Sequence, residues 1–373
     1  MALQFILGPS GAGKSEYIYE DIIRRTMQDE RENVIVLVPE QYSLEIQRKL
    51  VQKHPRGGSF QIDVIGFNRL AYRIFDELHI KPKKVLEDFG KSMLLRKAAQ
   101  EHKEELSLYA GSLDKAGFID EAKSLMSEIY QYDIPRERLR EALQKLDDSE
   151  EARVLARKLQ DMLVIFDAFE EKKGQSFIVA EQMLELLTAA AEQSELIAGS
   201  EIVLDGFTGF TPIQLNLISV LLRRAKKVTI VLTIDAATYE KKHVAEHELF
   251  ALTKQTIEHL LLTAEQAHVV VEPALFLGKD GCKRWSKGHP LAHLEQNLFR
   301  YPYRVGKDEE QAITITAYDT PAQELTGVAE QIRTLVMEQG YRYRDIAIVS
   351  GNLEETAEFA KRILPQYEIP YFI

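Results

Sequence analysis

The stretch GPSGAGKS at residues 8–15 limits the possible folds of this chain more than any other part of its sequence. It follows the apolar run of residues 3–7 and precedes a segment whose apolar residues recur at helical spacing. A strand, a glycine turn and a helix in this order are the context in which the pattern GxxxxGK[ST] forms a phosphate-binding loop. The alternative interpretation is a glycine turn that serves packing only.

Each residue type in this stretch suits the binding of a polyphosphate. Gly11 and Gly13 lack a Cβ, so successive backbone N–H groups can turn towards phosphate oxygens. The positive end of the following helix favours an anion at the same place. Lys14 would contact the β- and γ-phosphates, and the Ser15 hydroxyl would ligate Mg²⁺. We therefore predict a site for ATP and Mg²⁺ whose nucleotide-binding residues are Gly8, Ser10, Gly11, Gly13, Lys14 and Ser15.

Apolar runs recur along the chain in the pattern of an α/β fold. Residues 33–38 and 228–234 are almost entirely apolar, as in strands that are buried on both faces of a parallel sheet. Shorter runs at residues 61–65 and 201–205 have the same character, and helical patterns follow these runs. We predict a doubly wound parallel sheet domain formed by residues 1–80 together with 197–300.

The sequence pattern changes between residues 81 and 196. Proline and glycine become rare there, and apolar residues recur at i, i+3 and i+4, which predicts a helical insertion of about five helices. A further α/β unit is expected at residues 308–373, as the truncated start of a second domain. Its predicted strands are residues 313–317 and 346–349, and its predicted helices are residues 322–339 and 353–364.

Composition excludes several classes of protein. The single cysteine, Cys282, cannot form a disulfide framework, which indicates a reduced, cytoplasmic protein. No apolar run approaches the roughly 18 residues of a membrane span, and we expect no signal peptide because residues 3–7 belong to the first strand. The formal net charge of −11 argues against a uniformly basic surface for nucleic acid. Any DNA contact would therefore be local.

Six segments occur in order along the 373 residues: GPSGAGKS, VPEQ, GFNRLAYRIF, LDGFTGFTPIQ, TIDAATYE and GYRYRDIAIVSGN. Together they resemble superfamily-1 helicases and, more closely, the AddB (RexB) family, whose members form the AddAB (RexAB) helicase–nucleases of Gram-positive bacteria with a partner chain. The resemblance implies a RecA-like P-loop NTPase domain (1A), interrupted by a helical domain (1B) and followed by the start of a second motor-like domain (2A).

The same resemblance implies a function, partners and cofactors. Members of this family are subunits of an ATP-dependent helicase/deoxyribonuclease that acts in double-strand break repair and recombination. The expected partners are the AddA (RexA) helicase/nuclease subunit and single-stranded DNA, which AddB scans for the short regulatory sequence Chi. The family also carries a nuclease domain with an iron–sulfur cluster held by four cysteines. A chain with one cysteine cannot hold that cluster, so we expect no nuclease activity here.

The chain departs from a working helicase motor at three places. Asp205 ends a predicted strand and would be a Mg²⁺ ligand, or alternatively a cap of the following turn. Gly206 stands where a glutamate would activate the attacking water. The resemblance also implies a glutamine segment before the first strand, which this sequence does not show. It further implies an arginine where this chain has Ser350, Gly351 and Asn352. We therefore predict ATP binding with feeble hydrolysis, and no catalytic residue in this chain.

Loops that follow the strands of such motor domains hold single-stranded DNA by stacking bases on aromatic rings and by bonding phosphates. Parallel strands end at one edge of a sheet, so these loops should meet in one groove although they are about 140 residues apart. The alternative is that Phe67 and Tyr72 are core aromatics. The candidate DNA-binding residues are Gln41, Ser43, Phe67, Arg69, Tyr72, Phe207 and Phe210.

A second function from another class remains open at this stage. A phosphate loop also occurs in autonomous P-loop enzymes, such as independent ATPases and small-molecule kinases. The helical insertion and the lack of a compact substrate lid speak against such an enzyme. ATPase activity measured with and without single-stranded DNA would separate the two functions.

Overall fold

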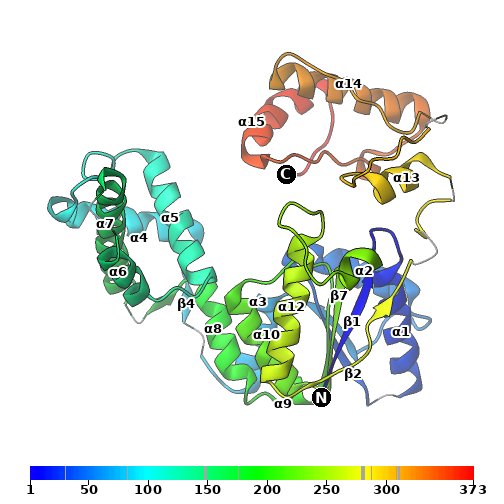
Figure 1. Ribbon diagram of the computed structural model, residues 1–373, viewed down its shortest axis with the longest axis horizontal. Coiled ribbons are helices and arrows are strands. Elements are labelled where there is room, and N and C mark those ends of the chain that lie inside the picture. The colour runs from blue at the N-terminus through cyan, green and yellow to red at the C-terminus, as the bar shows by residue number, and fades with distance from the viewer. Residues whose placement is uncertain are drawn as a thin grey trace. The chain divides into compact units, whose positions relative to one another are not determined.

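The computed structural model describes residues 1–29, 31–81, 83–146, 149–174, 176–278, 282–286, 288–307, 309 and 311–373. The chain divides into two compact units, Met1–Tyr303 and Arg304–Ile373, and each is described by itself (Figure 1).

A seven-stranded sheet organises the first unit. Its strand order is β3-β2-β6-β7-β1-β8, with β9 also paired to β1, and every one of these pairings is parallel. This confirms the predicted α/β class with a parallel sheet. The strands are β1 (Ala2–Gly8), β2 (Asn33–Leu37), β3 (Ile62–Ile65), β6 (Ser200–Leu204), β7 (Lys227–Thr233), β8 (Val270–Val271) and β9 (Leu275–Phe276).

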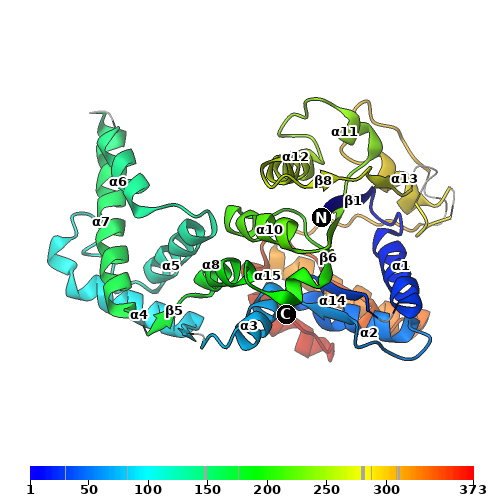
Figure 2. The same cartoon turned by 90° about the horizontal axis from the view of Figure 1, so that it is seen from below.

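Helices cover both faces of this sheet (Figure 2). Side chains alternate across a strand, so Phe5 and Leu7 of β1 join one core and Ile6 joins the other. The Ile6 core lies under α1 (Lys14–Gln28) and α2 (Ser43–Lys53). The opposite core lies under α3 (Phe67–Glu77), α8 (Ala180–Ala191), α10 (Pro212–Arg224) and α12 (Ala251–Gln266).

The helical insertion has a hydrophobic core of its own, built from residues between Leu95 and Val179. A short two-stranded parallel sheet, β4 (Lys84–Val85) with β5 (Phe177–Ile178), joins the two ends of this insertion. Its helices are α4 (Asp88–Glu101), α5 (Ala116–Gln131), α6 (Arg136–Gln144) and α7 (Glu150–Lys173).

Helix α8 falls within residues 81–196, which we predicted as a helical insertion, but it packs into the core of the large sheet. Met183, Leu187 and Ala191 of this helix are buried in the core of the large sheet, against α3 and α10. Periodicity identified α8 as a helix but not the core that it joins. The short helices of this unit are η1 (Glu40–Tyr42), η2 (Lys103–Glu105), α9 (Glu195–Ala198), α11 (Ala236–Glu240) and α13 (Pro290–Asn297).

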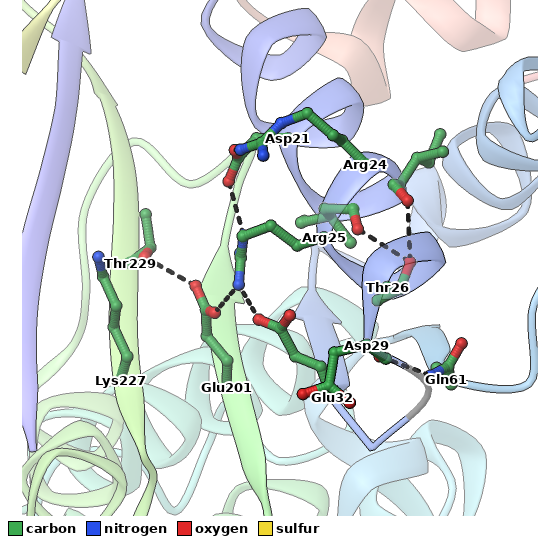
Figure 3. A network of polar contacts seen from close by, with 12 residues as sticks. Asp21, Arg24, Arg25, Thr26, Asp29, Glu32, Gln61, Glu201, Lys227 and Thr229 are labelled. Carbon is green, nitrogen blue, oxygen red and sulfur yellow. Dashed lines mark hydrogen bonds and ion pairs between the residues drawn. The ribbon is translucent and has the colours of Figure 1, made fainter.

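A charged network ties the end of α1 to the sheet (Figure 3). Arg25 donates to Glu201 of β6 at 2.7 Å and to Asp21 at 2.8 Å, and it also pairs with Glu32. Glu201 is buried and accepts a second hydrogen bond from Thr229 of β7. Arg25 therefore compensates a carboxylate that lies inside the fold.

The second unit consists of α14 (Pro321–Gln339) and α15 (Leu353–Ile363), which pack on one another, with short 3₁₀ turns η3 (Tyr343–Asp345) and η4 (Leu364–Tyr367). Both helices were predicted. The strands predicted at residues 313–317 and 346–349 are wrong, because neither segment is hydrogen-bonded into a sheet among the described residues. A strand needs a ladder partner, and apolar sequence alone does not supply one.

Candidate nucleotide site

The glycine-rich stretch forms a tight loop between β1 and α1. Gly13 has φ 86° and immediately precedes Lys14, the first residue of the helix. Lys14 is buried, and its Nζ donates to the carbonyl oxygens of Gly8 at 2.9 Å and Pro9 at 2.8 Å. The lysine is thus held against its own loop at the positive end of α1.

A cavity of about 660 Å³ lies beside this loop. It brings together predicted site residues that are about 190 residues apart, because β1 and β6 end at the same edge of the parallel sheet. Gly8 is the only one of the predicted nucleotide-binding residues that is not among its lining residues. The cavity is lined by Ser10, Gly11, Gly13, Lys14, Ser15, Glu16, Tyr17, Glu20, Lys49, Asp205, Gly206, Phe207, Thr208, Val231, Thr233, Lys283 and Arg284.

Asp205 follows the last residue of β6 and is buried. Its backbone N–H donates to Leu37 at 3.0 Å, and its Oδ2 accepts a hydrogen bond from the Tyr19 hydroxyl at 2.7 Å. Ser15 and Tyr19 are four residues apart on α1 and so share one face of that helix. Ser15 and Asp205 both line the cavity and offer a hydroxyl and a carboxylate oxygen, which fits the ligand preference of Mg²⁺.

Burial and neighbouring charges set the electrostatics of the loop. Burial is the main reason that the pKa of Lys14 is lowered, and the like charge of Arg284 lowers it further. The carboxylates of Asp205 and Glu295 act in the opposite direction on the pKa of Lys14. Burial, followed by the charge of Asp205, raises the pKa of Tyr19, so Tyr19 remains a hydrogen-bond donor at neutral pH.

The turn after β6 contains one glycine with a special backbone. Gly206 has φ 83°, in the left-handed region that favours glycine. Gly209, three residues further along the same segment, does not have a positive φ. Gly206 therefore serves the turn and provides no side chain for acid–base chemistry.

The structure adds two cations that the sequence did not reveal. Lys283 and Arg284 line the cavity, and their backbone N–H groups donate to the carbonyl oxygen of Gly11 at 3.1 and 3.2 Å. They are about 270 residues from the loop in sequence. The only signal in the sequence is that residues 278–306 are rich in glycine, lysine, arginine and proline.

A second cavity, of about 700 Å³, includes Pro9 of the loop together with Trp285 and Glu295 among its lining residues. Glu295 of α13 accepts a hydrogen bond from the backbone N–H of Ser10. In the same cavity Asp235 forms an ion pair with Arg300 at 2.5 Å.

Three of the proposed DNA-binding aromatic residues form one cluster. The ring centroids of Phe67 and Phe207 are 5.4 Å apart, and those of Phe207 and Phe210 are 5.3 Å apart. All three side chains are partly buried and pack against the core of the sheet. The loop after β6 therefore meets the start of α3, as expected for the carboxyl edge.

The other four DNA candidates differ in exposure. Gln41, Arg69 and Tyr72 are exposed, whereas Ser43 is buried and donates its hydroxyl hydrogen to the carbonyl oxygen of Glu40 at 2.9 Å. Glu40 was not predicted as a site residue. Its Oε1 accepts the backbone N–H of Asn68 at 3.0 Å, so a carboxylate already occupies the positive end of α3.

These features define an α/β protein with a parallel sheet and a glycine-rich loop at the carboxyl edge of its strands. A family profile described as "ADDB, N-terminal" matches residues 5–295, and the chain belongs to this family. This confirms the family resemblance seen in the sequence. In the part of the chain that the structure describes, no helix is long and apolar enough to cross a membrane.

Similar curated proteins are named as the B subunits of ATP-dependent helicase/deoxyribonucleases. The protein of Lachnoclostridium phytofermentans is 38% identical over 377 residues, that of Alkaliphilus metalliredigens is 33% identical over 373 residues, and that of Clostridium novyi is 31% identical over 373 residues. Each alignment covers all of this chain and 32% of the relative. The chain thus spans about a third of the length of these relatives.

Proposed function

We propose that this chain is the nucleotide-binding, helicase-like region of the AddB component of an ATP-dependent helicase/deoxyribonuclease that acts in double-strand break repair and recombination. The observation that carries the proposal is the shared cavity, in which Lys14 and Ser15 of the glycine-rich loop lie with Asp205 of β6. In this proposal the sheet is a RecA-like P-loop NTPase domain, and the protein works in the cytoplasm with the AddA helicase/nuclease chain as its partner.

The cavity supplies the groups that a bound nucleotide needs. Backbone N–H groups of the loop and the positive end of α1 would bind phosphate oxygens. Lys14 would exchange its bonds to Gly8 and Pro9 for bonds to phosphate. Ser15 and Asp205 would hold Mg²⁺, which neutralises charge on the phosphates. The Tyr19 hydroxyl would keep Asp205 oriented.

Hydrolysis by this site should be feeble. Proton transfer from the attacking water needs a positioned base, and Gly206 has no side chain where the helicase pattern has a glutamate. Arginine is likewise absent at Ser350, Gly351 and Asn352. We therefore assign binding and scaffolding, and not motor action, to this region.

We propose single-stranded DNA as the second ligand. The protein would bind this strand in order to scan it for Chi. The supporting observation is the aromatic cluster of Phe67, Phe207 and Phe210 at the carboxyl edge of the sheet. The exposed Tyr72 and Arg69 on α3 offer a ring and a cation close to this cluster in sequence. Base stacking contributes roughly 1–3 kcal/mol per base.

Binding of Mg²⁺–ATP by the full chain tests the nucleotide site directly. Isothermal titration calorimetry should show one site that is lost in Lys14→Ala and kept in Lys242→Ala, whose side chain is exposed and lies outside the cavity. Steady-state hydrolysis should stay feeble with and without single-stranded DNA. Brisk turnover that depends on Lys14 would instead support the alternative of an autonomous P-loop ATPase or small-molecule kinase.

Salt dependence of oligonucleotide binding tests the DNA proposal. Arg69→Ala should weaken binding of single-stranded DNA and flatten its dependence on salt, because one phosphate contact is lost. Tyr72→Ala should weaken binding with little change in that slope, because stacking does not release counterions. Equal affinity of both variants and the unaltered chain would refute DNA contact at α3.

A further inference from the structure

Residues 282–286, which we call the strap, sit directly on the glycine-rich loop. Two consecutive N–H groups of the strap, those of Lys283 and Arg284, bond the same carbonyl oxygen of Gly11. The Cys282 thiol donates to the Ser10 carbonyl oxygen with an S–O distance of 3.4 Å. A Cβ at Gly11 would collide with Cys282 Sγ, so the strap fits only because residue 11 is a glycine.

The side chains of the strap reach the cavity from a segment other than the one that carries Lys14. Lys283 and Arg284 both line this cavity. If residue 13, just before the helix, carried a Cβ, that atom would lie 3.3 Å from Cδ of Lys283. The Lys283 side chain therefore lies against Gly13. The strap thus brings two cations to the cavity beside the glycine-rich loop.

The charges that line the cavity favour a polyanion. Its cations are Lys14, Lys49, Lys283 and Arg284, and its carboxylates are Glu16, Glu20 and Asp205. Glu16 and Glu20 are paired with Lys53, and Lys49 is paired with Glu45; neither Lys53 nor Glu45 lies in the lining. Asp205 accepts the Tyr19 hydroxyl hydrogen.

The electrostatic effect of Arg284 on Lys14 supports this interpretation. Arg284 lowers the pKa of Lys14, as expected for two like charges that lie near each other. A triphosphate between these cations would relieve their repulsion and would gain charge-assisted hydrogen bonds from both.

We propose that the strap is a phosphate clamp supplied within the same chain, in which Lys283 and Arg284 bind the polyphosphate of a nucleotide held by Lys14. This proposal rests on the proposed nucleotide binding and adds to it two specific binding residues. Arg284 would provide a planar group with several donors, and Lys283 a compact charge.

Trp285 allows the clamp to be observed without any enzymatic activity. It is the only tryptophan of the chain and follows Arg284 directly, with the guanidinium carbon 5.8 Å from the indole centroid. When Arg284 moves to bind phosphate, the surroundings of the indole change. The intrinsic fluorescence of the chain should therefore report occupation of the clamp.

The experiment titrates the full chain with Mg²⁺–ATP and, separately, with inorganic tripolyphosphate, and follows tryptophan emission and calorimetric heat. The variants are Lys14→Ala, Lys283→Ala, Arg284→Ala, Arg284→Lys and the control Lys242→Ala, with thermal unfolding as the check that each is folded. Lys14→Ala should abolish the binding of both probes, whereas loss of Lys283 or of Arg284 alone should weaken it about tenfold. Arg284→Lys should recover part of this loss, and Lys242→Ala should bind like the unaltered chain.

The outcomes separate the clamp from the site on which it rests. If the chain binds ATP in a Lys14-dependent way but a Lys283→Ala/Arg284→Ala double variant binds equally well, the clamp is refuted and the nucleotide site stands. If the unaltered chain binds neither probe, or Lys14→Ala binds as tightly, both proposals fail.

Discussion

The hydroxyl of Tyr19 donates a hydrogen bond of 2.7 Å to Oδ2 of Asp205, across 186 residues of sequence. Tyr19 lies one turn beyond Ser15 on α1, and Asp205 follows β6. This bond joins the helix that begins at the glycine-rich loop to the end of a buried strand. It fixes the carboxylate that we propose as a ligand of Mg²⁺.

Tyr19→Phe should lower the free energy of unfolding by about 1–3 kcal/mol, since a buried carboxylate loses a hydrogen bond. Urea unfolding of the full chain measures this change. Tyr17→Phe is the matched control, because Tyr17 is an exposed tyrosine on the same helix. The prediction fails if the two variants are equally stable.

Arg25→Ala should destabilise the protein by about 3 kcal/mol, because Glu201 would remain buried without its cation. Arg24 also pairs with Asp21, but its side chain is mostly exposed. Arg24→Ala should therefore cost less than about 1 kcal/mol. Denaturant unfolding of both variants measures the two losses of stability. Similar losses would show that the buried ion pair contributes no more to stability than the exposed one.

Asp161 of α7 should make stability depend on acid pH. Burial acts to raise the pKa of Asp161, but hydrogen bonds from the backbone N–H groups of Ser107, Tyr109 and Leu108 and from the Ser107 hydroxyl outweigh it, and the pKa is lowered. A carboxylate with a lowered pKa stabilises the fold above the ordinary pKa of an aspartate, about 3.9, and this stabilisation is lost as pH falls through the lowered value.

Asp161→Asn should thus destabilise the protein by about 2–4 kcal/mol at pH 7, because the amide NH₂ faces hydrogen-bond donors. Its stability should change less than that of the unaltered chain between pH 5 and pH 3. Asp167→Asn is the control on the same helix, since Asp167 pairs with Arg136 and Arg140 at the surface and should contribute little. Parallel pH profiles of Asp161→Asn and the unaltered chain would contradict the assignment.

Glu295→Gln should stabilise the protein at neutral pH. Burial is the main cause that raises the pKa of Glu295, and the neighbouring Asp235 adds to it. Ionisation of a carboxyl with a raised pKa costs stability, so the unaltered chain loses stability as pH rises through this pKa and the glutamine variant does not. The gain in melting temperature should be larger at pH 7.5 than at pH 4.5. A gain that does not vary with pH would refute this cause.

The local order of residues predicted much of the fold. The apolar runs at residues 33–38 and 228–234 correspond to β2 (Asn33–Leu37) and β7 (Lys227–Thr233), because their side chains fill both faces of a parallel sheet. The glycine-rich loop lies between a strand and a helix because its flanking patterns define both. The topological rule for parallel sheets also predicted that Phe67 would lie near Phe207.

Contacts between distant segments decided the rest. The apolar run at residues 346–349 is not a strand here, because pairing depends on a partner that periodicity does not specify. The helical pattern of α8 was evident, but only packing placed it in the core of the large sheet. Nothing in the local sequence linked the Tyr19 hydroxyl or the strap cations Lys283 and Arg284 to the glycine-rich loop. A sequence pattern reflects only the interactions of a segment with residues close to it in the chain. These groups reach the glycine-rich loop and its cavity only when the sheet brings distant segments to one edge.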